Sequence, residues 1–376
     1  MSFEYEKLEN VCEILDSQRV PITEKDRKPG IYPYYGANGV QDYIDDFIFD
    51  DELVLLAEDG GNFGSKDKPI AYRVSGKCWV NNHAHVLKAK DNIDIDYLCY
   101  SLMFYNTNGL VNGATRQKLT QTAMRQMLIP LRKKDVQLKI VKKINLLFQL
   151  IKKRNQQLSK LDQLVKSRFI EMFGDVYLNT MSWDEKALES IADIVSGITK
   201  GRKIKNKKLK EVPYMAVSNV KDGYIDWSTV KKIDATDEEI SRYRLLKDDV
   251  LITEGGDPDK VGRGAIIKNP LENCIHQNHI FRVRLNKLIV LPVFFAEYLQ
   301  HQKSKMYFLG CAKQTTGIAS INMKQLKSLP VLLPQIELQR QFSDFIQYVE
   351  KAKSSVKQSL DKLETLKKSL MQEYFG

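Results

Sequence analysis

The chain has 376 residues, of which 43% are hydrophobic and 28% are charged. At roughly 100–200 residues per domain, this length predicts two domains or slightly more, and the composition excludes a chain that is disordered throughout. The sequence has no run of about 18 apolar residues and its first residues lack the apolar segment of a secretory signal, so we expect no membrane span and no secretion. The five cysteines are widely spaced, which excludes a disulfide framework and favours the cytoplasm.

Positive charge is concentrated in particular segments. The formal net charge is +11, yet residues 1–130 sum to −5 and residues 131–174 to +9. The surplus in 131–174 is explained equally well by contact with a polyanion, by lysine stems that cover an apolar face, and by acidic partner proteins. The densest cluster follows Gly197 in a predicted loop, which either neutralises phosphates or is simply solvated. It comprises Lys200, Arg202, Lys203, Lys205, Lys207, Lys208 and Lys210.

The sequence contains an internal repeat. The segment LSKLDQLVKSRFIEMFG, which ends the first half, is similar to LDKLETLKKSLMQEYFG, which ends the second. An offset of 202 aligns the later parts of the halves, and an offset of 180 aligns their beginnings. In the middle, the pattern Cys-x3-Asn-His at Cys78 recurs at Cys274. We therefore expect two halves of the same plan, 1–174 and 175–376.

Each half begins with short runs of β-forming residues that glycine, proline and Asn-Gly separate. Leu53–Leu56 is one such run, and its period and flanking turns favour a buried strand. Helical stretches are expected at 94–105 and 290–308. We therefore predict the α+β fold class, with one α+β domain over residues 1–130 and a second over residues 175–330.

A long helix is predicted after each domain, over residues 131–174 and 331–376. Beyond the first turn neither segment contains proline or glycine until the glycine that ends it, and Pro334 suits a first turn. An apolar residue recurs every seven positions, which is typical of a coiled-coil seam. We expect the two helices to pack antiparallel, although parallel pairing and packing on the helix's own domain remain alternatives. The seam residues are Ile144, Ile151, Leu158 and Val165 in the first helix, and Phe342, Val349, Val356, Leu363 and Leu370 in the second.

Particular segments resemble a known family. The run YPYYGANG at Tyr32–Gly39, followed by LLAEDGG at Leu55–Gly61, resembles a target-recognition domain of type I restriction–modification specificity subunits. So does ATRQKL at Ala114–Leu119, which leads to Pro130 and a long helix. The resemblance covers the whole chain, because domain, helix, domain, helix is the family's architecture. The second half departs from it, since Tyr214–Asn219 lacks the Tyr-Gly-Ala-Asn-Gly run.

The resemblance implies a non-catalytic specificity subunit. Each domain would read one part of a bipartite, asymmetric target in double-stranded DNA, and the helix pair would set the gap between the parts. The subunit would recruit two methyltransferase subunits, and restriction subunits with nuclease and translocase activity would join them. It also implies no cofactor in this chain, with S-adenosylmethionine, ATP and magnesium on the partners. The alternatives are a type II specificity subunit with a fused methyltransferase–nuclease partner, a coiled-coil scaffold without a DNA role, and an enzyme with an unrecognised site.

Base reading requires polar side chains on exposed loops. Asparagine, glutamine, arginine and lysine pair with base edges, and glycine lets the backbone approach closely. The candidates in the first half are Asn38, Asn62, Lys66, Arg116, Gln117 and Lys118. Those in the second half are Asn219, Lys260, Arg263, Lys313, Gln314 and Thr315.

No motif of catalysis or metal binding is convincing. The run from Gly60 to Lys66 lacks the spacing of a phosphate-binding loop, and no Asn-Pro-Pro-Tyr run of adenine methyltransferases occurs. Cysteine and histidine lie close together in both halves, but without the paired spacing of a zinc site. We therefore predict no metal and no catalytic residue, and a structural role for these side chains, which are Cys78, His83, His85, Cys274, His276 and His279.

Overall fold

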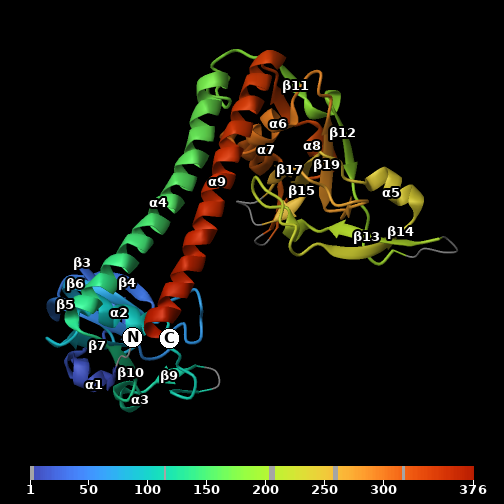
Figure 1. Cartoon of the computed structure of the whole chain (residues 1–376). Coiled ribbons are helices and arrows are strands. Elements are labelled where there is room, and N and C mark those ends of the chain that lie inside the picture. Colours follow the sequence, from blue (N-terminus) through green and yellow to red (C-terminus); the bar gives the residue numbers. More distant parts are fainter. Residues whose placement is uncertain (1–3, 114–115, 203–207, 257–260, 316–317) are drawn as a thin grey trace. The chain divides into compact units, whose positions relative to one another are not determined.

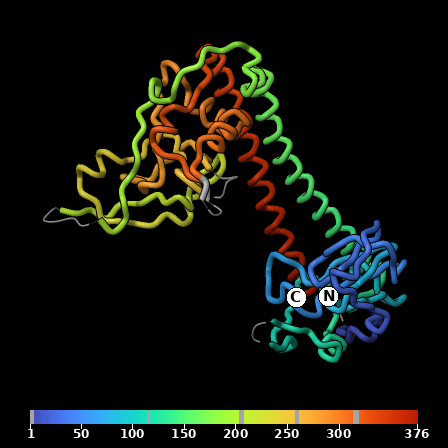
Figure 2. The backbone as a smooth tube through the Cα atoms, turned by 180° about the vertical axis from the view of Figure 1, so that it is seen from behind, coloured from blue at the N-terminus to red at the C-terminus, as the bar shows by residue number. Residues whose placement is uncertain are grey.

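The computed structural model describes residues 4–113, 116–202, 208–256, 261–315 and 318–376 (Figure 1). Helices and strands are mixed along this part of the chain, as predicted for the α+β class. The chain divides into two compact units: unit 1 contains residues 1–156 and 356–376, and unit 2 contains residues 157–355. Both ends of the chain therefore belong to unit 1 (Figure 2). Among the described helices, none combines the length and apolar character needed to cross a membrane.

Unit 1 is built on a six-stranded sheet with the order β2-β7-β5-β6-β3-β4. β3 runs parallel to β6, and the other neighbours are antiparallel. Both faces of β5 are buried, because Val54 and Leu56 pack in one cluster with helix α2 and Leu53 and Leu55 pack in a second. The elements are β1 (Glu4–Lys7), α1 (Leu8–Val11), β2 (Cys12–Ile14), η1 (Asp16–Gln18), η2 (Glu24–Asp26), β3 (Pro29–Gly36), β4 (Gly39–Ile44), β5 (Phe49–Ala57), β6 (Ala71–Val80), β7 (Ala84–Ala89), α2 (Ile95–Met103), β8 (Val111–Asn112), β9 (Lys118–Leu119), α3 (Gln121–Arg125) and β10 (Leu128–Leu131).

Unit 2 repeats this plan with smaller sheets. β13 runs parallel to β18, as β3 does to β6, and β15 lies between β17 and β19, as β5 lies between β6 and β7. The predicted helical stretch 290–308 is two helices, because the chain turns at Gln300 and His301. The elements are β11 (Glu185–Ala187), η3 (Leu188–Ser190), β12 (Ala192–Ser196), β13 (Lys210–Met215), η4 (Val217–Asn219), β14 (Lys231–Ala235), α5 (Asp237–Tyr243), β15 (Val250–Thr253), β16 (Gly255–Gly256), β17 (Gly264–Ile266), β18 (Ile275–His276), β19 (Ile280–Leu285), α6 (Pro292–Tyr298), α7 (Gln302–Cys311), β20 (Lys313–Thr315), β21 (Ile318–Ser320), α8 (Met323–Lys327) and β22 (Pro330–Leu332).

The two long helices are α4 (Lys134–Phe173) and α9 (Ile336–Phe375), and segments of them pair antiparallel within each unit. In unit 1 the Arg154 Nε donates to the Ser359 Oγ at 3.2 Å, and the Lys367 Nζ lies 5.9 Å from the Phe148 ring centroid. In unit 2 the Lys353 Nζ lies 2.7 Å from the Asp162 carboxylate. Of the predicted seam residues, Ile144, Ile151, Val165, Phe342, Val349 and Val356 are buried, and Leu158, Leu363 and Leu370 are half-buried.

Each unit is completed by the end of the helix that belongs to the other half of the sequence. In unit 1, Met371 joins the core and the Phe375 ring lies 5.1 Å from that of Tyr97 in α2. In unit 2, the Phe173 ring lies 4.8 Å from that of Phe294 in α6. These aromatic contacts are repeat equivalents of one another. Neither half of the sequence therefore contains all of the residues that close its own core.

A buried glutamine fastens each long helix to its domain. The Gln137 Oε1 accepts from the Asp94 N–H at 2.7 Å, and its Nε2 donates to the Asn92 and Arg132 carbonyls at 3.0 and 2.7 Å. Gln339 makes the same three bonds, at 2.8, 3.1 and 2.8 Å. Its partners are the Leu291 N–H and the carbonyls of Ile289 and Pro334. Each side chain satisfies backbone groups at the start of its own helix and at the start of α2 or α6.

We expect Gln137→Leu and Gln339→Leu each to lower the free energy of unfolding by about 3 kcal/mol. Leucine has a similar volume but leaves three polar backbone groups without their partner, and this loss outweighs the apolar gain. Urea denaturation measures the change. Gln163→Leu, at an exposed position of α4, is the control and should change little. A loss no larger than that of the control would show that the glutamine is not the fastening.

Candidate nucleic-acid interface

In unit 1 a loop that contains glycine follows the central strand β5. This loop, Glu58–Gly61, is held by its backbone. The Glu58 N–H donates to the His83 carbonyl at 2.9 Å, and the Glu58 carbonyl accepts from the Leu119 N–H at 2.7 Å. Gly60 has φ +61°, a left-handed conformation that favours glycine. The loop therefore joins the segment before β7 to the β8–β9 hairpin.

Unit 2 contains the same backbone frame. The loop Glu254–Gly256 follows β15, the Glu254 N–H donates to the His279 carbonyl at 3.0 Å, and the Glu254 carbonyl accepts from the Ile321 N–H at 2.8 Å. The glycines form β16, which pairs with the hairpin strand β21. Both units thus bring together a Glu-Gly loop, an Asn-His segment and a hairpin, three features that lie far apart in the sequence.

Several predicted base readers of unit 1 surround its loop. The Asn38 Nδ2 donates to the Gly60 carbonyl at 3.0 Å, and the Asn62 Nδ2 donates to the Asn38 Oδ1 at 3.0 Å. The Arg116 Nη2 lies 2.9 Å from the Asp59 Oδ1, while 60% of the arginine side chain stays exposed. Gln117 and Lys66 are also exposed. These side chains form one polar surface of the kind that base recognition requires.

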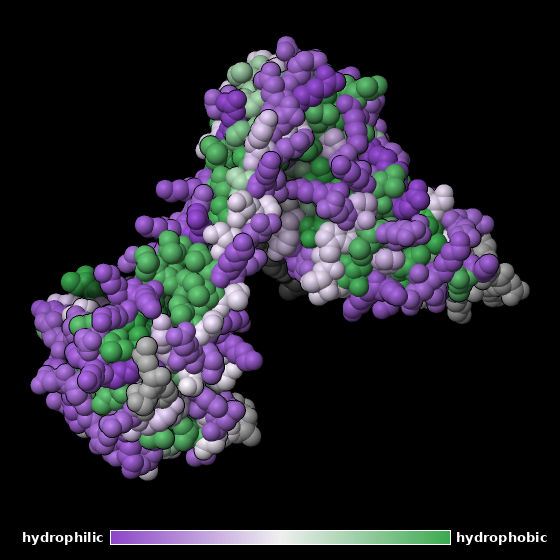
Figure 3. Space-filling model, viewed as in Figure 1, coloured by the Kyte–Doolittle hydropathy of each residue, from purple (hydrophilic) through white to green (hydrophobic). Residues whose placement is uncertain are grey.

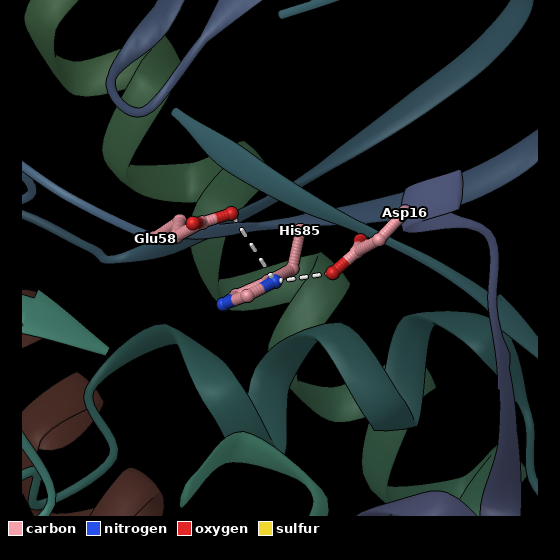
Figure 4. Close-up of side chains that lie close together, drawn as sticks. All are labelled: Asp16, Glu58 and His85. Carbon is pink, nitrogen blue, oxygen red and sulfur yellow. Dashed lines mark hydrogen bonds and ion pairs between the residues drawn. The ribbon is translucent and has the colours of Figure 1, made fainter. Parts of the chain in front are cut away.

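A buried cluster of Asp16, Glu58 and His85 lies at the same loop (Figure 4). The His85 Nδ1 is 2.6 Å from the Asp16 Oδ2 and 3.6 Å from the Glu58 Oε2. The His85 Nε2 lies 2.9 Å from the Leu119 carbonyl oxygen, so the ring connects the sheet to the end of the hairpin. One imidazole and two carboxylates are ligand types that metal ions take.

Internal donors already occupy these carboxylates. The Arg19 Nη1 lies 2.7 Å from Glu58, the Lys118 Nζ lies 3.0 Å from Glu58, and the Gln121 Nε2 donates to Asp16 at 3.1 Å. Burial alone would raise the pKa of Glu58, but hydrogen bonds from Arg19 and Lys118 hold it below its ordinary value. The cluster is thus charge-balanced without a metal and suits the structural role predicted for His85. It also uses the Lys118 ammonium, a predicted base reader.

The structure corrects the interpretation of Asn219. This side chain is fully buried, its Oδ1 accepts from the Ala216 N–H at 2.9 Å, and its Nδ2 donates to the Asp226 carbonyl and the Thr229 hydroxyl at 3.0 and 2.9 Å. Its hydrogen-bonding capacity is therefore used inside the fold, and no base can reach it.

The remaining candidates of unit 2 lie on or beside strands. The Arg263 carbonyl accepts from the Thr253 N–H at 3.0 Å, and its buried Nε has no partner among the described atoms. Lys313 is exposed, and it begins β20, which also contains Gln314 and Thr315. Lys260 lies outside the described residues.

The basic cluster of 200–210 is partly neutralised. Arg202 forms two hydrogen bonds of 2.6 Å with the Glu239 carboxylate, which raises the pKa of Arg202, so this predicted phosphate contact is already paired. The Lys210 Nζ is 2.5 Å from Asp237. Lys200 and Lys208 are exposed, and no described acidic side chain forms an ion pair with them. Lys203, Lys205 and Lys207 lie outside the described part of the chain.

Sequence reasoning missed two histidines that the loops place at the surface. The His83 Nδ1 lies 2.6 Å from the Asp59 Oδ1, and the His279 Nδ1 lies 2.6 Å from the Glu254 Oε2. Their side chains are 34% and 55% exposed. Both follow an asparagine at an offset of 196, and this recurrence was the available signal. The sequence did not show which carboxylates approach them.

Comparison with known proteins agrees with this architecture. The sequence matches the family described as "Type I restriction modification DNA specificity domain" over residues 2–160 and 181–365, one match in each half. The chain therefore belongs to this family. A crystal structure of the type I restriction–modification S subunit from M. genitalium superposes with a TM-score of 0.59 at 15% identity, covering 100% of this chain and 96% of that one. At this identity the likeness shows the fold alone.

Sequence relatives carry names of the same kind. A Haemophilus influenzae protein provisionally named a type I restriction enzyme specificity subunit is 37% identical over 139 residues, which are 37% of this chain and 36% of the relative. The EcoKI specificity subunit of Escherichia coli is 25% identical, over 43% of this chain and 36% of the relative. The StySPI specificity subunit of Salmonella potsdam is 20% identical, over 86% of this chain and 74% of the relative. The first two alignments thus span about a third of those relatives.

We expect stability to fall in mild acid because of His276. Burial lowers the pKa of His276 from 6.5 to about 4, so the unfolded chain takes up this proton at a higher pH than the folded chain. The stabilisation is complete above pH 6.5 and is lost as the pH falls from 6.5 towards 4, by up to about 3 kcal/mol.

Urea denaturation at a series of pH values measures this effect, and His276→Leu should remove it because leucine takes up no proton. His279→Ala, which changes the exposed histidine of the same segment, is the matched control and should keep the effect. An unchanged pH dependence in His276→Leu would contradict the expectation.

Proposed function

We propose that this chain is the DNA-recognition subunit of a type I restriction–modification complex, and that each unit reads one part of a bipartite, asymmetric target. The observation that carries the proposal is the duplicated family match, over 2–160 and 181–365. The same loop, Asn-His segment and hairpin meet in both units, with different side chains on them. Two similar domains with different polar surfaces are what a target of two unequal parts requires.

We propose that the chain itself performs no chemistry. S-adenosylmethionine, ATP and magnesium would then be bound by partner subunits. Four of the five cysteines are buried, and burial raises the pKa of Cys78 to about 11 and that of Cys99 to about 12. Thiols of this kind are poor nucleophiles. The carboxylates of the loop in unit 1 are held by arginine, lysine and histidine, which suits positioning of side chains better than proton transfer.

An apolar face of α4 supports a role in subunit assembly. Leu138, Leu146 and Leu150 are exposed and follow one another at helical spacing, and the first two line a shallow groove of about 400 Å³. Figure 3 shows apolar surface over this part of α4. An exposed stripe of this kind fits an amphipathic helix of a partner. We assign it to a methyltransferase subunit, two of which would bind the chain before the restriction subunits join.

Exchange of one recognition domain tests the two-part model. Replacing residues 1–130 with another member's domain should change only one part of the methylated sequence, and replacing 175–330 should change only the other. The donor domain should keep an aromatic residue at Tyr97, because Phe375 packs on it. Sequencing of methylated positions, in cells that lack the native system, gives the result. A change in both parts, or no sequence preference at all, would contradict the proposal.

Removal of exposed positive charge should weaken DNA binding without changing the preferred sequence. Lys200, Lys208 and Lys231 are exposed in unit 2, and no described acid pairs with them, so alanine at these positions should lower the salt slope of binding by about one per phosphate contact. The matched control is Lys210→Ala with Lys232→Ala, whose ammonium groups are paired with Asp237 and Glu211. Titration at several salt concentrations measures the slope, and equal slopes in both variants would remove these lysines from the interface.

A further inference from the structure

A histidine paired with a carboxylate occurs at the same place in both units. In unit 1 the His83 Nδ1 lies 2.6 Å from Asp59, and in unit 2 the His279 Nδ1 lies 2.6 Å from Glu254. The histidines are repeat equivalents, but the carboxylates are not, because Glu254 aligns with Glu58. The two loops thus reach one geometry with different residues. A contact that two sequences build in different ways points to a requirement for the contact itself.

The carboxylate determines which nitrogen of each ring carries the proton. A carboxylate accepts hydrogen bonds, so the Nδ1–H donates to it and the Nε2 keeps its lone pair. In unit 1 the Arg116 Nη2 also donates to the Asp59 Oδ1, at 2.9 Å, and helps to hold that group. In unit 2 the Asn278 Nδ2 lies 3.2 Å from the His279 Nε2, the arrangement expected when Nε2 accepts.

The backbone holds both rings in a fixed position at the polar surface. The carbonyl groups of His83 and His279 accept the Glu58 and Glu254 N–H groups, at 2.9 and 3.0 Å. Each histidine immediately precedes a central strand, β7 or β19, and about a third to a half of each side chain is exposed. A hydrogen-bond acceptor whose proton position and backbone are both fixed is preorganised for a donor on a ligand.

We propose that the Nε2 atoms of His83 and His279 each accept a hydrogen bond from the exocyclic amino group of a base in the major groove. This inference rests on the proposed function and names the base edge that each unit reads. Only adenine and cytosine present an amino donor in the major groove, whereas guanine and thymine present acceptors there. A phosphate has no donor, so a ring in this protonation state does not suit the DNA backbone. The histidines therefore select adenine or cytosine at one position in each part of the target.

A cycle of protein variants and modified duplexes tests the assignment. The full chain is assembled with its methyltransferase partner, and the target is first found from the methylated positions. Duplexes then carry, one position at a time, purine in place of adenine or pyrimidin-2-one in place of cytosine, which removes only the amino group. Wild type should lose affinity about tenfold at one position in each part, as expected for one hydrogen bond.

The His83→Ala complex should bind the unmodified duplex about tenfold more weakly, and removing the amino group at the sensitive position should then have no further effect. His279→Ala should behave in the same way at a position in the other part. Asn82→Ala, at the exposed neighbour of His83, is the matched control and should keep the wild-type profile. His83→Gln keeps an acceptor near the place of Nε2 and should retain part of the selectivity, which separates this role from a folding defect.

Three results would overturn the assignment. They are wild-type affinity in His83→Ala, losses that simply add at every modified position, and a reduced salt slope without dependence on any amino group, which would indicate a phosphate contact. Failure of the proposed function is a separate result, because an assembly that methylates no defined sequence fails before any duplex is made.

Discussion

Each recognition domain depends on a helix end that the other half of the sequence supplies. Phe375 of α9 packs on Tyr97 in unit 1, and Phe173 of α4 packs on Phe294 in unit 2. At its other end each helix is tied to the preceding domain by a buried glutamine with three hydrogen bonds. A helix that is fixed at both ends cannot slide by one turn without losing a glutamine site or an aromatic contact. The helix register therefore follows from the domains, and the seven-residue seam only has to be compatible with it.

The two units keep the backbone frame and change the chemistry placed on it. Where unit 1 has Asp16 and His85 side by side in a charge-balanced cluster, the aligned positions of unit 2 are Ser196 and Phe281, which face each other across β12 and β19. The hydrogen bonds that hold the Glu-Gly loop nevertheless agree to within 0.1 Å in both units. Backbone hydrogen bonds do not depend on side-chain identity, so they can hold a loop in place while its side chains vary. This separation lets two domains of one fold present different surfaces.

Much of the fold followed from local pattern, whereas much of the site did not. Helices predicted over 131–174 and 331–376 run over Lys134–Phe173 and Ile336–Phe375, because proline, glycine and apolar spacing are local signals. Asn219 and Arg202 looked like DNA contacts because polar residues near glycine suggest exposed loops. Their partners, Asp226 with Thr229 and Glu239, come from other segments, and only the tertiary structure reveals that these side chains are already satisfied. Gln137 was overlooked for the same reason, since a buried glutamine in a helix looks like any exposed one.

The distribution of paired and exposed charge suggests different contributions of the two units to DNA binding. In unit 1 the cations at the loop are committed, because Arg19 and Lys118 bind Glu58 and Arg116 binds Asp59. In unit 2 Lys200 and Lys208 are exposed without a described acidic partner. Attraction to phosphates acts over about 10 Å and weakens with salt, whereas a hydrogen bond to a base acts only on contact. Unit 2 is therefore better suited to long-range attraction, and unit 1 has to discriminate through short-range contacts held in place by its own ion pairs.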